Sequence, residues 1–218
     1  MELSTAELLS LFVDQEILVV GNGVSARRLF DHAAWCDAST TLVVFNHGPA
    51  GLPAPSLIRD KAWRHALYVC AAEPDEDYQQ SVEAFFALDA RNHHVFFNEP
   101  YCRDTSVYRD VVAHGKTSSY ALIEEDVERR YSIKDPATNT ILSSGALICR
   151  LLTNVGAYRT LRVGGVDCFS NDGSLHFFEH MDSHGHDSNV EIMEWSLIGG
   201  RRDVILDTGL LDVLADHA

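Results

Sequence analysis

The sequence predicts an α/β protein built on one mainly parallel, twisted sheet with helices on both faces, a Rossmann-like arrangement. Short apolar runs with the composition of buried strands alternate with segments of helical spacing, a pattern typical of parallel sheets. The first of these runs ends directly in a glycine-rich turn, GNG, which a helix start follows. No linker or low-complexity run divides the 218 residues, so we expect one domain over 1–218.

Six segments account for the expected strands. Each is a short run rich in apolar residues, and most of them end at or near Gly, Pro, Asn or Asp, which favour turns. The segments are 16–23, 41–48, 66–72, 93–101, 160–169 and 203–207.

Helical spacing of apolar residues predicts helices between these strands. The clearest is 143–156, where Ser143 or Ser144 provides the N-cap and Gly156 follows the last turn. A less regular helix is expected at 120–131. The other expected helices are 5–13, 25–34, 77–90 and 189–200.

The charge balance disfavours two classes of partner. With 17 basic and 32 acidic residues the net charge is −15, which disfavours nucleic acids and anionic membranes.

No apolar run is long enough for a membrane span, and the N-terminus lacks the features of a signal peptide. The five cysteines are widely spaced, without a CxxC pair, as in a reducing compartment. We therefore expect a cytoplasmic protein, and the oligomeric state stays open, a homo-oligomer included.

Three asparagines lie at the ends of predicted strands. Asn22 lies at the end of the first long strand, Asn46 at the end of the second and Asn98 at the end of the fourth. Because the carboxyl ends of parallel strands meet at one edge of a sheet, these amides are expected on the same edge, where ligands of such sheets bind. Amide groups both donate and accept hydrogen bonds, so they suit a polar ligand without adding charge.

The turn GNGVSA (21–26) also matches the GxGxxA dinucleotide fingerprint between a strand and a helix. That fingerprint requires an acidic residue at the end of the second strand to hold the ribose hydroxyls, and Asn46 occupies this place. A nicotinamide-dependent oxidoreductase is therefore one alternative, and a tight strand-to-helix turn without a nucleotide is another.

The segment HFFEHMDSHGHDSNVE (176–191) holds four histidines and four acidic residues. His176, His180 and His184 recur every four residues and, with Asp182 or Asp187, could bind zinc if the segment were helical. Its glycine and serine content instead favours a loop, in which this spacing has no meaning. A metal-dependent hydrolase and a solvated acidic loop without chemistry are thus two further interpretations.

Four motifs together resemble those of the sialyltransferases, of both the eukaryotic type and the smaller bacterial type. VVGNGVSARR followed by VVFNHGP is similar to the large sialylmotif, and the segment 142–169, which opens with LSSG, is similar to the small one. HFFE (176–179) resembles the third motif, His-Tyr-Tyr-Glu, and HDSNVE (186–191) matches the very small motif, His-x4-Glu. The four occur in the order of the family and cover about half of the chain.

The resemblance implies a sialyltransferase fold of the GT-A-variant type. It also implies inverting transfer of sialic acid, or of a related keto-sugar acid, from a CMP donor to a glycan hydroxyl, with neither a metal nor a cofactor. By position, His186 is the general base, and His176 donates a hydrogen bond to the donor phosphate. Residues 100–140 would form an insertion on the acceptor side, or a lid. The implied donor-binding residues are Gly21, Asn22, Gly23, Asn46, Ser143, Ser144, Gly145 and Asp167.

Two positions depart from the pattern of the bacterial enzymes. Ile141 stands where they have an arginine ahead of the Ser-Ser-Gly run, and Phe169 stands where they have a phosphate-binding tyrosine. A relative that binds CMP without catalysing transfer is therefore kept as an alternative.

Overall fold

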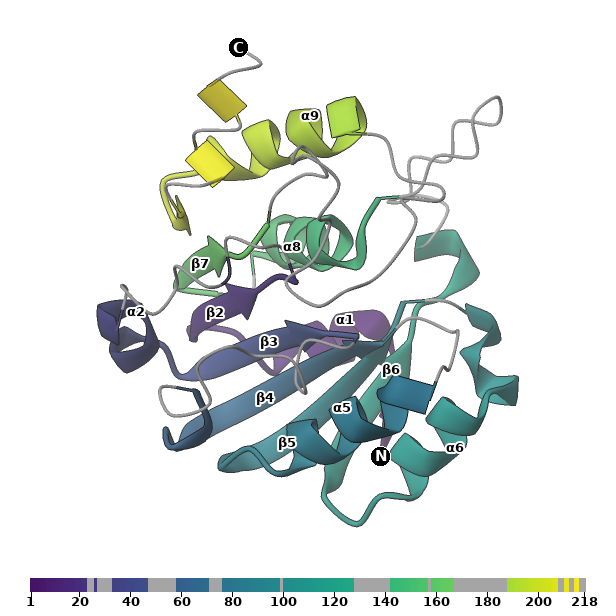
Figure 1. Cartoon of the computed structure of the whole chain (residues 1–218). Helices are drawn as coiled ribbons and strands as arrows, with labels where there is room; N and C mark the ends of the chain where they lie inside the picture. Colours follow the sequence, from purple (N-terminus) through teal and green to yellow (C-terminus); the bar gives the residue numbers. More distant parts are fainter. Residues whose placement is uncertain are drawn as a thin grey trace.

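The computed structural model has one central sheet of eight parallel strands (Figure 1). This confirms the α/β class and the Rossmann-like arrangement of helices on both faces of the sheet. The structure describes residues 1–22, 26, 33–46, 58–70, 76–98, 100–127, 142–156, 158–166, 188–207, 210–211 and 214–215.

The strands follow the order β1-β6-β5-β4-β3-β2-β7-β8, and every neighbouring pair is parallel. The central strands carry almost only buried side chains, as a sheet covered on both faces requires. The bounds are β1 Glu2–Leu3, β2 Glu16–Val20, β3 Thr41–Phe45, β4 Trp63–Cys70, β5 Ala90–Phe97, β6 Thr117–Leu122, β7 Thr160–Gly164 and β8 Val204–Leu206.

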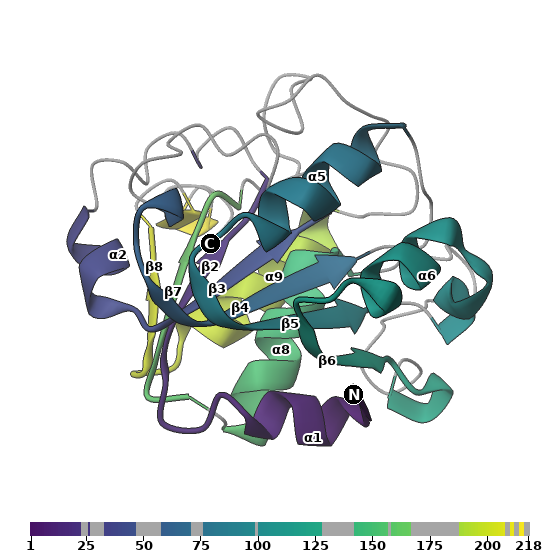
Figure 2. The same ribbon diagram turned by 90° about the horizontal axis from the view of Figure 1, so that it is seen from below.

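Helices cover the two faces separately, as Figures 1 and 2 show. On one face, α1, α8 and α9 enclose a core around Phe12, Leu147 and Trp195. On the other, α2, α5 and α6 enclose a core around Tyr78, Phe85 and Val111. The bounds are α1 Thr5–Ser10, α2 Ala33–Ala38, α5 Glu76–Phe86, the 3₁₀ helix η2 Pro100–Asp104, α6 Ser106–Ala113, α8 Ser144–Val155 and α9 Ser188–Gly199.

The strand order has its switch point between β2 and β7. From β2 the chain builds the sheet in one direction through β3, β4, β5 and β6, and it then returns to place β7 on the other side of β2. In open parallel sheets the crevice beside such a switch point, at the carboxyl ends of the strands, is where ligands bind. The segments that follow β2 and β7 therefore flank the expected binding position.

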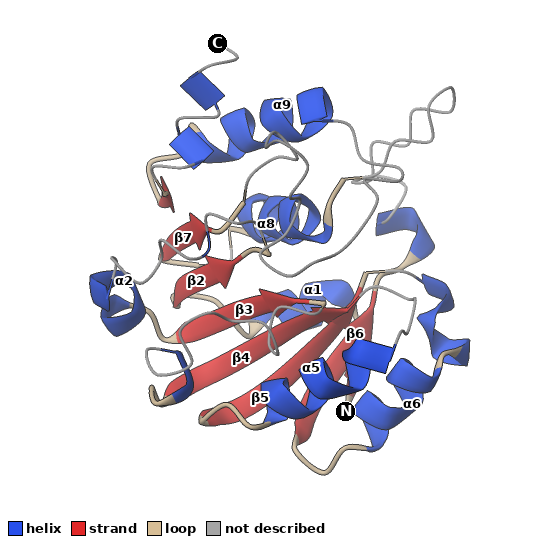
Figure 3. Ribbon diagram, in the orientation of Figure 1, coloured by secondary structure: helices blue, strands red, loops and turns tan. Residues whose placement is uncertain are grey.

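The sequence-based elements are mostly confirmed, with one clear error (Figure 3). All six expected strands are present, although their bounds shift by a few residues. The helix expected at 120–131 is wrong at its start, because residues 120–122 belong to β6. Within the expected insertion at 100–140, residues 100–122 form η2, α6 and β6, and the role of this segment beside an acceptor stays a prediction. Residues 128–140 of that expectation lie outside the described residues.

The helix at 25–34 also lies largely outside the described residues, and α2 instead begins at Ala33. By contrast, α8 forms as its caps predict. Ser143 is the N-cap and its hydroxyl accepts a hydrogen bond from Ala146 N–H, while Gly156 ends the helix in the left-handed conformation with φ 63°.

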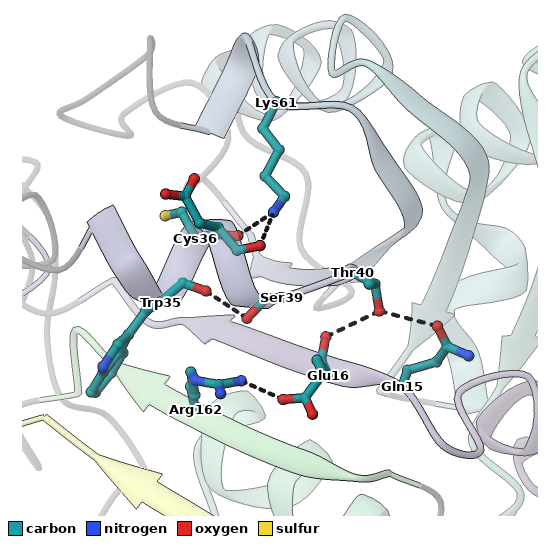
Figure 4. Close-up of polar contacts among 9 residues, drawn as sticks. Gln15, Glu16, Trp35, Cys36, Ser39, Thr40, Lys61 and Arg162 are labelled. Carbon is teal, nitrogen blue, oxygen red and sulfur yellow. Dashed lines mark hydrogen bonds and ion pairs between the residues drawn. The ribbon is translucent and has the colours of Figure 1, made fainter.

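The amino ends of β2, β3 and β7 are joined by structural polar contacts (Figure 4). Arg162 Nη1 forms an ion pair with Glu16 Oε2 at 2.7 Å across β7 and β2. Thr40 Oγ1 donates to Gln15 Oε1 at 3.1 Å. Lys61 Nζ donates to the carbonyl oxygens of Cys36 and Asp37, the favourable place for a cation at the end of α2.

A chain of buried polar side chains crosses β4, β5 and β6 on the α1 face. His65 Nδ1 and His94 Nε2 lie 2.9 Å apart, and His94 Nδ1 lies 2.7 Å from Ser119 Oγ. The ring of Phe12 packs edge-on against both imidazoles, at centroid distances of 5.8 and 5.7 Å. Burial, with the neighbouring histidines, lowers the pKa of His94 from 6.5 to about 4. Burial likewise lowers the pKa of His65.

This histidine pair should make the fold sensitive to acid. The unfolded chain protonates His94 near pH 6.5, whereas the folded chain resists protonation until about pH 4, so stability falls as pH falls through this window. The loss from His94 alone is on the order of 3 kcal/mol at the acid end. Urea unfolding between pH 4 and 7 measures it. His94→Gln should flatten the pH dependence, whereas His114→Gln, at a half-buried site, should keep it. An unchanged slope in His94→Gln would contradict the assignment.

Among the described residues, no helix has both the length and the apolar character needed to cross a membrane.

Candidate functional site

The candidate site lies at the carboxyl edge of the sheet. Asn22 follows β2, Asn46 follows β3 and Asn98 follows β5, and because all strands are parallel the three lie on the same edge. The N-terminus of α8 joins them, since Asn98 Nδ2 donates to Ser144 Oγ at 2.7 Å. The sequence therefore predicted correctly that Asn22, Asn46 and Asn98 lie at one edge of the sheet.

The turn after β2 is held against the turn after β7 at the switch point. Gly21 N–H donates to Gly164 O at 2.8 Å. A Cβ on Gly21 would lie 2.3 Å from Gly165 O, so no side chain fits there. Gly165 itself has φ 75°, and its N–H donates to Asp207 Oδ2 at 3.0 Å. The close approach of two backbones, rather than a nucleotide, is thus sufficient to explain Gly21.

Replacing Gly21 by Ala should therefore destabilise the protein. The added methyl group meets backbone atoms on the neighbouring strand end, which can move only if the β2–β7 contact opens, at a cost of about 1–3 kcal/mol. Thermal unfolding measures the change. Gly115→Ala is the control, because a Cβ there meets nothing within 4 Å. Equal stability of the two variants would show that the turn adapts freely.

Asn22 offers a buried acceptor at the same place. Its Nδ2 donates to Phe45 O at 3.2 Å, which fixes the amide across the ends of β2 and β3. Its Oδ1 is buried and has no hydrogen-bond partner among the described residues. Because a buried acceptor without a partner is costly, this oxygen is suited to receive a hydrogen bond from a ligand.

Asn46 has a more structural environment. It has a positive φ of 40°, a conformation that asparagine tolerates better than most residues. Tyr68 Oη donates to Asn46 O at 2.6 Å, and Tyr78 Oη donates to Asn46 Oδ1 at 3.3 Å. Burial raises the pKa of Tyr78 well above its usual value, which keeps this hydroxyl a neutral donor. Tyr78 thus orients the side-chain amide of Asn46, and Tyr68 holds its backbone carbonyl.

Asn98, which follows β5, resembles Asn22 in having its amide nitrogen bonded and its amide oxygen buried. Its Nδ2 is occupied by Ser144 Oγ, and its Oδ1 is buried without a partner among the described residues. Since Ser144 Oγ accepts this bond, its own hydroxyl hydrogen stays available as a donor. The sequence placed Asn98 at a strand end but did not assign it to the donor site, because its contact to a residue 46 positions away leaves no local pattern.

Glu191 connects α9 to the start of α8. This side chain is 1% exposed, and its Oε1 accepts from Ser143 N–H at 2.5 Å while its Oε2 accepts from Ser143 Oγ at 3.0 Å. A carboxylate at a helix N-terminus also interacts favourably with the helix dipole. Glu191, which the sequence identified as the end of the His-x4-Glu motif and as a group that orients this segment or raises the basicity of His186, contacts Ser143 in the described structure.

The remaining donors at the start of α8 come from Ser144 and Gly145. First-turn amides have no acceptor within their own helix, so these N–H groups, with the Ser144 hydroxyl, can bind an anionic or polar group. Two buried acceptors and a helix N-terminus thus line one edge of the sheet. Among the residues that the structure describes, no group of three or more His, Cys, Asp or Glu side chains is placed to hold a metal ion.

Four of the predicted site residues lie outside the described residues: Gly23, Asp167, His176 and His186. The zinc alternative, which rests on His176, His180 and His184, lies there too. Their roles stay predictions. In the sequence, His186 precedes the start of α9 at Ser188 by two residues, and α9 carries Glu191 to the start of α8.

No known family model matches the chain, and a comparison with curated proteins gives no match.

Proposed function

We propose that the protein is a glycosyltransferase of sialyltransferase type. It transfers sialic acid or a related keto-sugar acid from a CMP donor to a glycan hydroxyl. The observation that carries the proposal is the meeting of Asn22, Asn98 and the N-terminus of α8 at one edge of the sheet, with two amide oxygens that have no partner among the described residues. The sequence motifs assigned Asn22 and the start of α8 to the donor nucleotide and sugar, and Asn98 adds a strand-end amide that contacts Ser144.

The chemistry of the edge suits such a donor. The buried oxygens of Asn22 and Asn98 accept hydrogen bonds, which the hydroxyl groups of ribose and sugar and the amino group of cytosine can supply. The Ser144 hydroxyl and the first-turn amides of α8 donate, which suits the phosphate or the sugar carboxylate. A local donor set is needed, because the chain as a whole carries a charge of −15 and repels an anionic donor.

The proposed reaction uses two histidines. The acceptor hydroxyl attacks the anomeric carbon of the donor sugar from the face opposite the phosphate, so the configuration inverts. The bond from that carbon to the phosphate oxygen breaks, and CMP departs with the electron pair. His186 takes the proton of the attacking hydroxyl, and His176 donates a hydrogen bond to the departing phosphate.

The first experiment is a thermal-shift panel with CMP, CDP, UDP, NAD and zinc chloride. A ligand at about a hundred times its dissociation constant stabilises the fold by roughly 2.7 kcal/mol, or about 5–10 °C in a domain of this size. We expect CMP and CDP to raise the melting temperature and the others to leave it unchanged. A shift with NAD or zinc alone would replace the proposal by the oxidoreductase or the metal-dependent hydrolase.

A second measurement separates transfer from binding alone. Incubation with CMP-sialic acid should release CMP, slowly with water and faster once a suitable glycan acceptor is supplied. CMP binding without any release from the donor would instead identify the protein as the non-catalytic relative that Ile141 and Phe169 leave open.

A further inference from the structure

A cavity lies at the amino edge of the sheet, opposite the candidate donor site. It has a volume of about 290 Å³ and is placed where α5 leads into β5 and α6 leads into β6. Its lining residues are Leu88, Asp89, Ala90, Arg91, His93 and Lys116. Nothing in the proposed transfer reaction uses this part of the molecule.

His93 gives the cavity an unsatisfied polar group. The side chain is 4% exposed, and its ring is fixed between Phe85, at a centroid distance of 5.1 Å and an angle of 90°, and Phe86, at 5.5 Å. Its Nε2 is buried and has no hydrogen-bond partner among the described residues. Buried polar atoms without a partner are rare and costly, so a ligand atom in the cavity would relieve a penalty that the free protein carries.

The charges around the cavity favour an anion. Arg91 and Lys116 contribute two exposed cations and Asp89 a single carboxylate, so the lining is positive by one charge in a chain of net charge −15. Lys116 is held in place, because its Nζ donates to Phe86 O at 2.6 Å. An ammonium group has three donors, so two remain for a ligand. Asp89 limits the charge that the site accepts and disfavours a polyanion.

We propose that this cavity is a binding site for a small oxyanion of the sulfate, phosphate or carboxylate class, held by Arg91, Lys116 and Nε2 of His93. The guanidinium and ammonium groups supply the charge, and the imidazole supplies the buried donor that fixes the orientation. The site is separate from the donor site, because it lies at the other ends of the same strands.

Binding at this site should depend on pH. Burial lowers the pKa of His93, and Lys116 and His114 from the turn between α6 and β6 lower it further. The carbonyl oxygens of Leu88 and Phe85 at the end of α5 act in the opposite direction. Arg91 disfavours the protonated ring and Asp89 favours it. An anion beside Nε2 stabilises the imidazolium, which donates from both nitrogens, so the anion should bind more tightly at pH 6 than at pH 7.5.

The test uses the whole chain and inorganic sulfate, which keeps the same charge across this range. The ring signals of His93 are followed by NMR while sodium sulfate is added against sodium chloride of equal ionic strength. His93→Gln identifies these signals, and sodium malonate is titrated in parallel to distinguish a carboxylate from a tetrahedral oxyanion. We expect a saturable shift, with binding at least threefold tighter at pH 6 than at pH 7.5.

Matched variants make the result specific. The double variant Arg91→Ala, Lys116→Ala should weaken sulfate binding at least tenfold, whereas Arg64→Ala, which removes an exposed cation outside the cavity, should not. Absence of a saturable shift, or equal affinity in the double variant, would overturn the proposal. CMP binding is measured in the same samples. CMP affinity should be the same in all of these variants, so failure of the anion site can be distinguished from failure of the proposed CMP site.

Discussion

Replacing Glu191 by Ala is expected to destabilise the protein by about 4 kcal/mol and to weaken CMP binding at least tenfold. The carboxylate accepts two hydrogen bonds from Ser143, and its side chain is 1% exposed. Hydrogen bonds to charged groups contribute roughly 1.5–3 kcal/mol each, and their loss leaves the N–H and hydroxyl of Ser143 without these acceptors. The start of α8, and with it Ser144, would then lose the contact that fixes its position relative to α9.

Glu194→Ala is a closely matched control for this change. Glu194 lies on the same helix and is 2% exposed, but it pairs with Arg150, whose side chain is 27% exposed and can be rehydrated. Burial raises the pKa of Glu194, so part of its charge interaction is already offset by the cost of desolvation. We expect a loss of about 1 kcal/mol and unchanged CMP affinity. Urea unfolding and calorimetric titration with CMP measure both quantities.

If both variants lose the same stability, Glu191 contributes only packing, and its role as a positioning residue is wrong. If Glu191→Ala loses stability but binds CMP normally, the start of α8 is not part of the nucleotide site. These two outcomes are distinguishable because unfolding and binding are measured on the same protein.

Replacing His186 by Ala is expected to lower kcat/KM for transfer by about 10²–10⁴-fold, the usual contribution of a general base. CMP affinity should change little, because a base acts on the acceptor hydroxyl rather than on the nucleotide. Stability should also change little relative to Glu191→Ala. Enzymatic rates with CMP-sialic acid and a glycan acceptor, together with CMP titration, measure the separation.

His184→Ala is the matched control, since it removes the same side chain two residues earlier in the same segment. It should leave transfer within a few-fold of the wild type. Equal loss of transfer in both variants, together with bound zinc in the purified protein, would favour the histidine cluster as a metal site. Equal loss of transfer and of CMP affinity in His186→Ala would contradict the assignment of His186 as the general base.

Local sequence patterns were sufficient where a structural element is determined by its own residues. The start and end of α8 followed from Ser143 and Gly156, and the placement of Asn22, Asn46 and Asn98 followed from the ends of apolar runs. They were insufficient for β1 and β6. β1 has only two residues, and β6 opens with the polar residues Thr-Ser-Ser, so neither has the apolar run of the central strands. Both segments become strands because they pair with neighbouring strands of the sheet.

The contacts within the candidate site were beyond local patterns for a related reason. Asn98 meets Ser144 across 46 positions, and Glu191 meets Ser143 across 48. Composition predicts which residues are polar at a strand end, but only the packing of α8 and α9 over the sheet decides which of them contact each other. Because of this packing, Ser143 donates its hydrogen bonds to Glu191, whereas the hydroxyl hydrogen of Ser144 stays available to a ligand.

The position of β7 has a consequence for how the chain folds. β2 is formed by residues 16–20, yet its partner on the switch-point side is β7, residues 160–164, and β1 likewise pairs with β6 more than a hundred residues later. Such distant pairings give a high contact order, which slows folding. During synthesis β2 therefore keeps one unpaired edge until most of the chain has emerged, and this edge is open to pairing with other chains. The candidate site, whose Asn22 and Gly21 follow β2, is complete only once that pairing has formed.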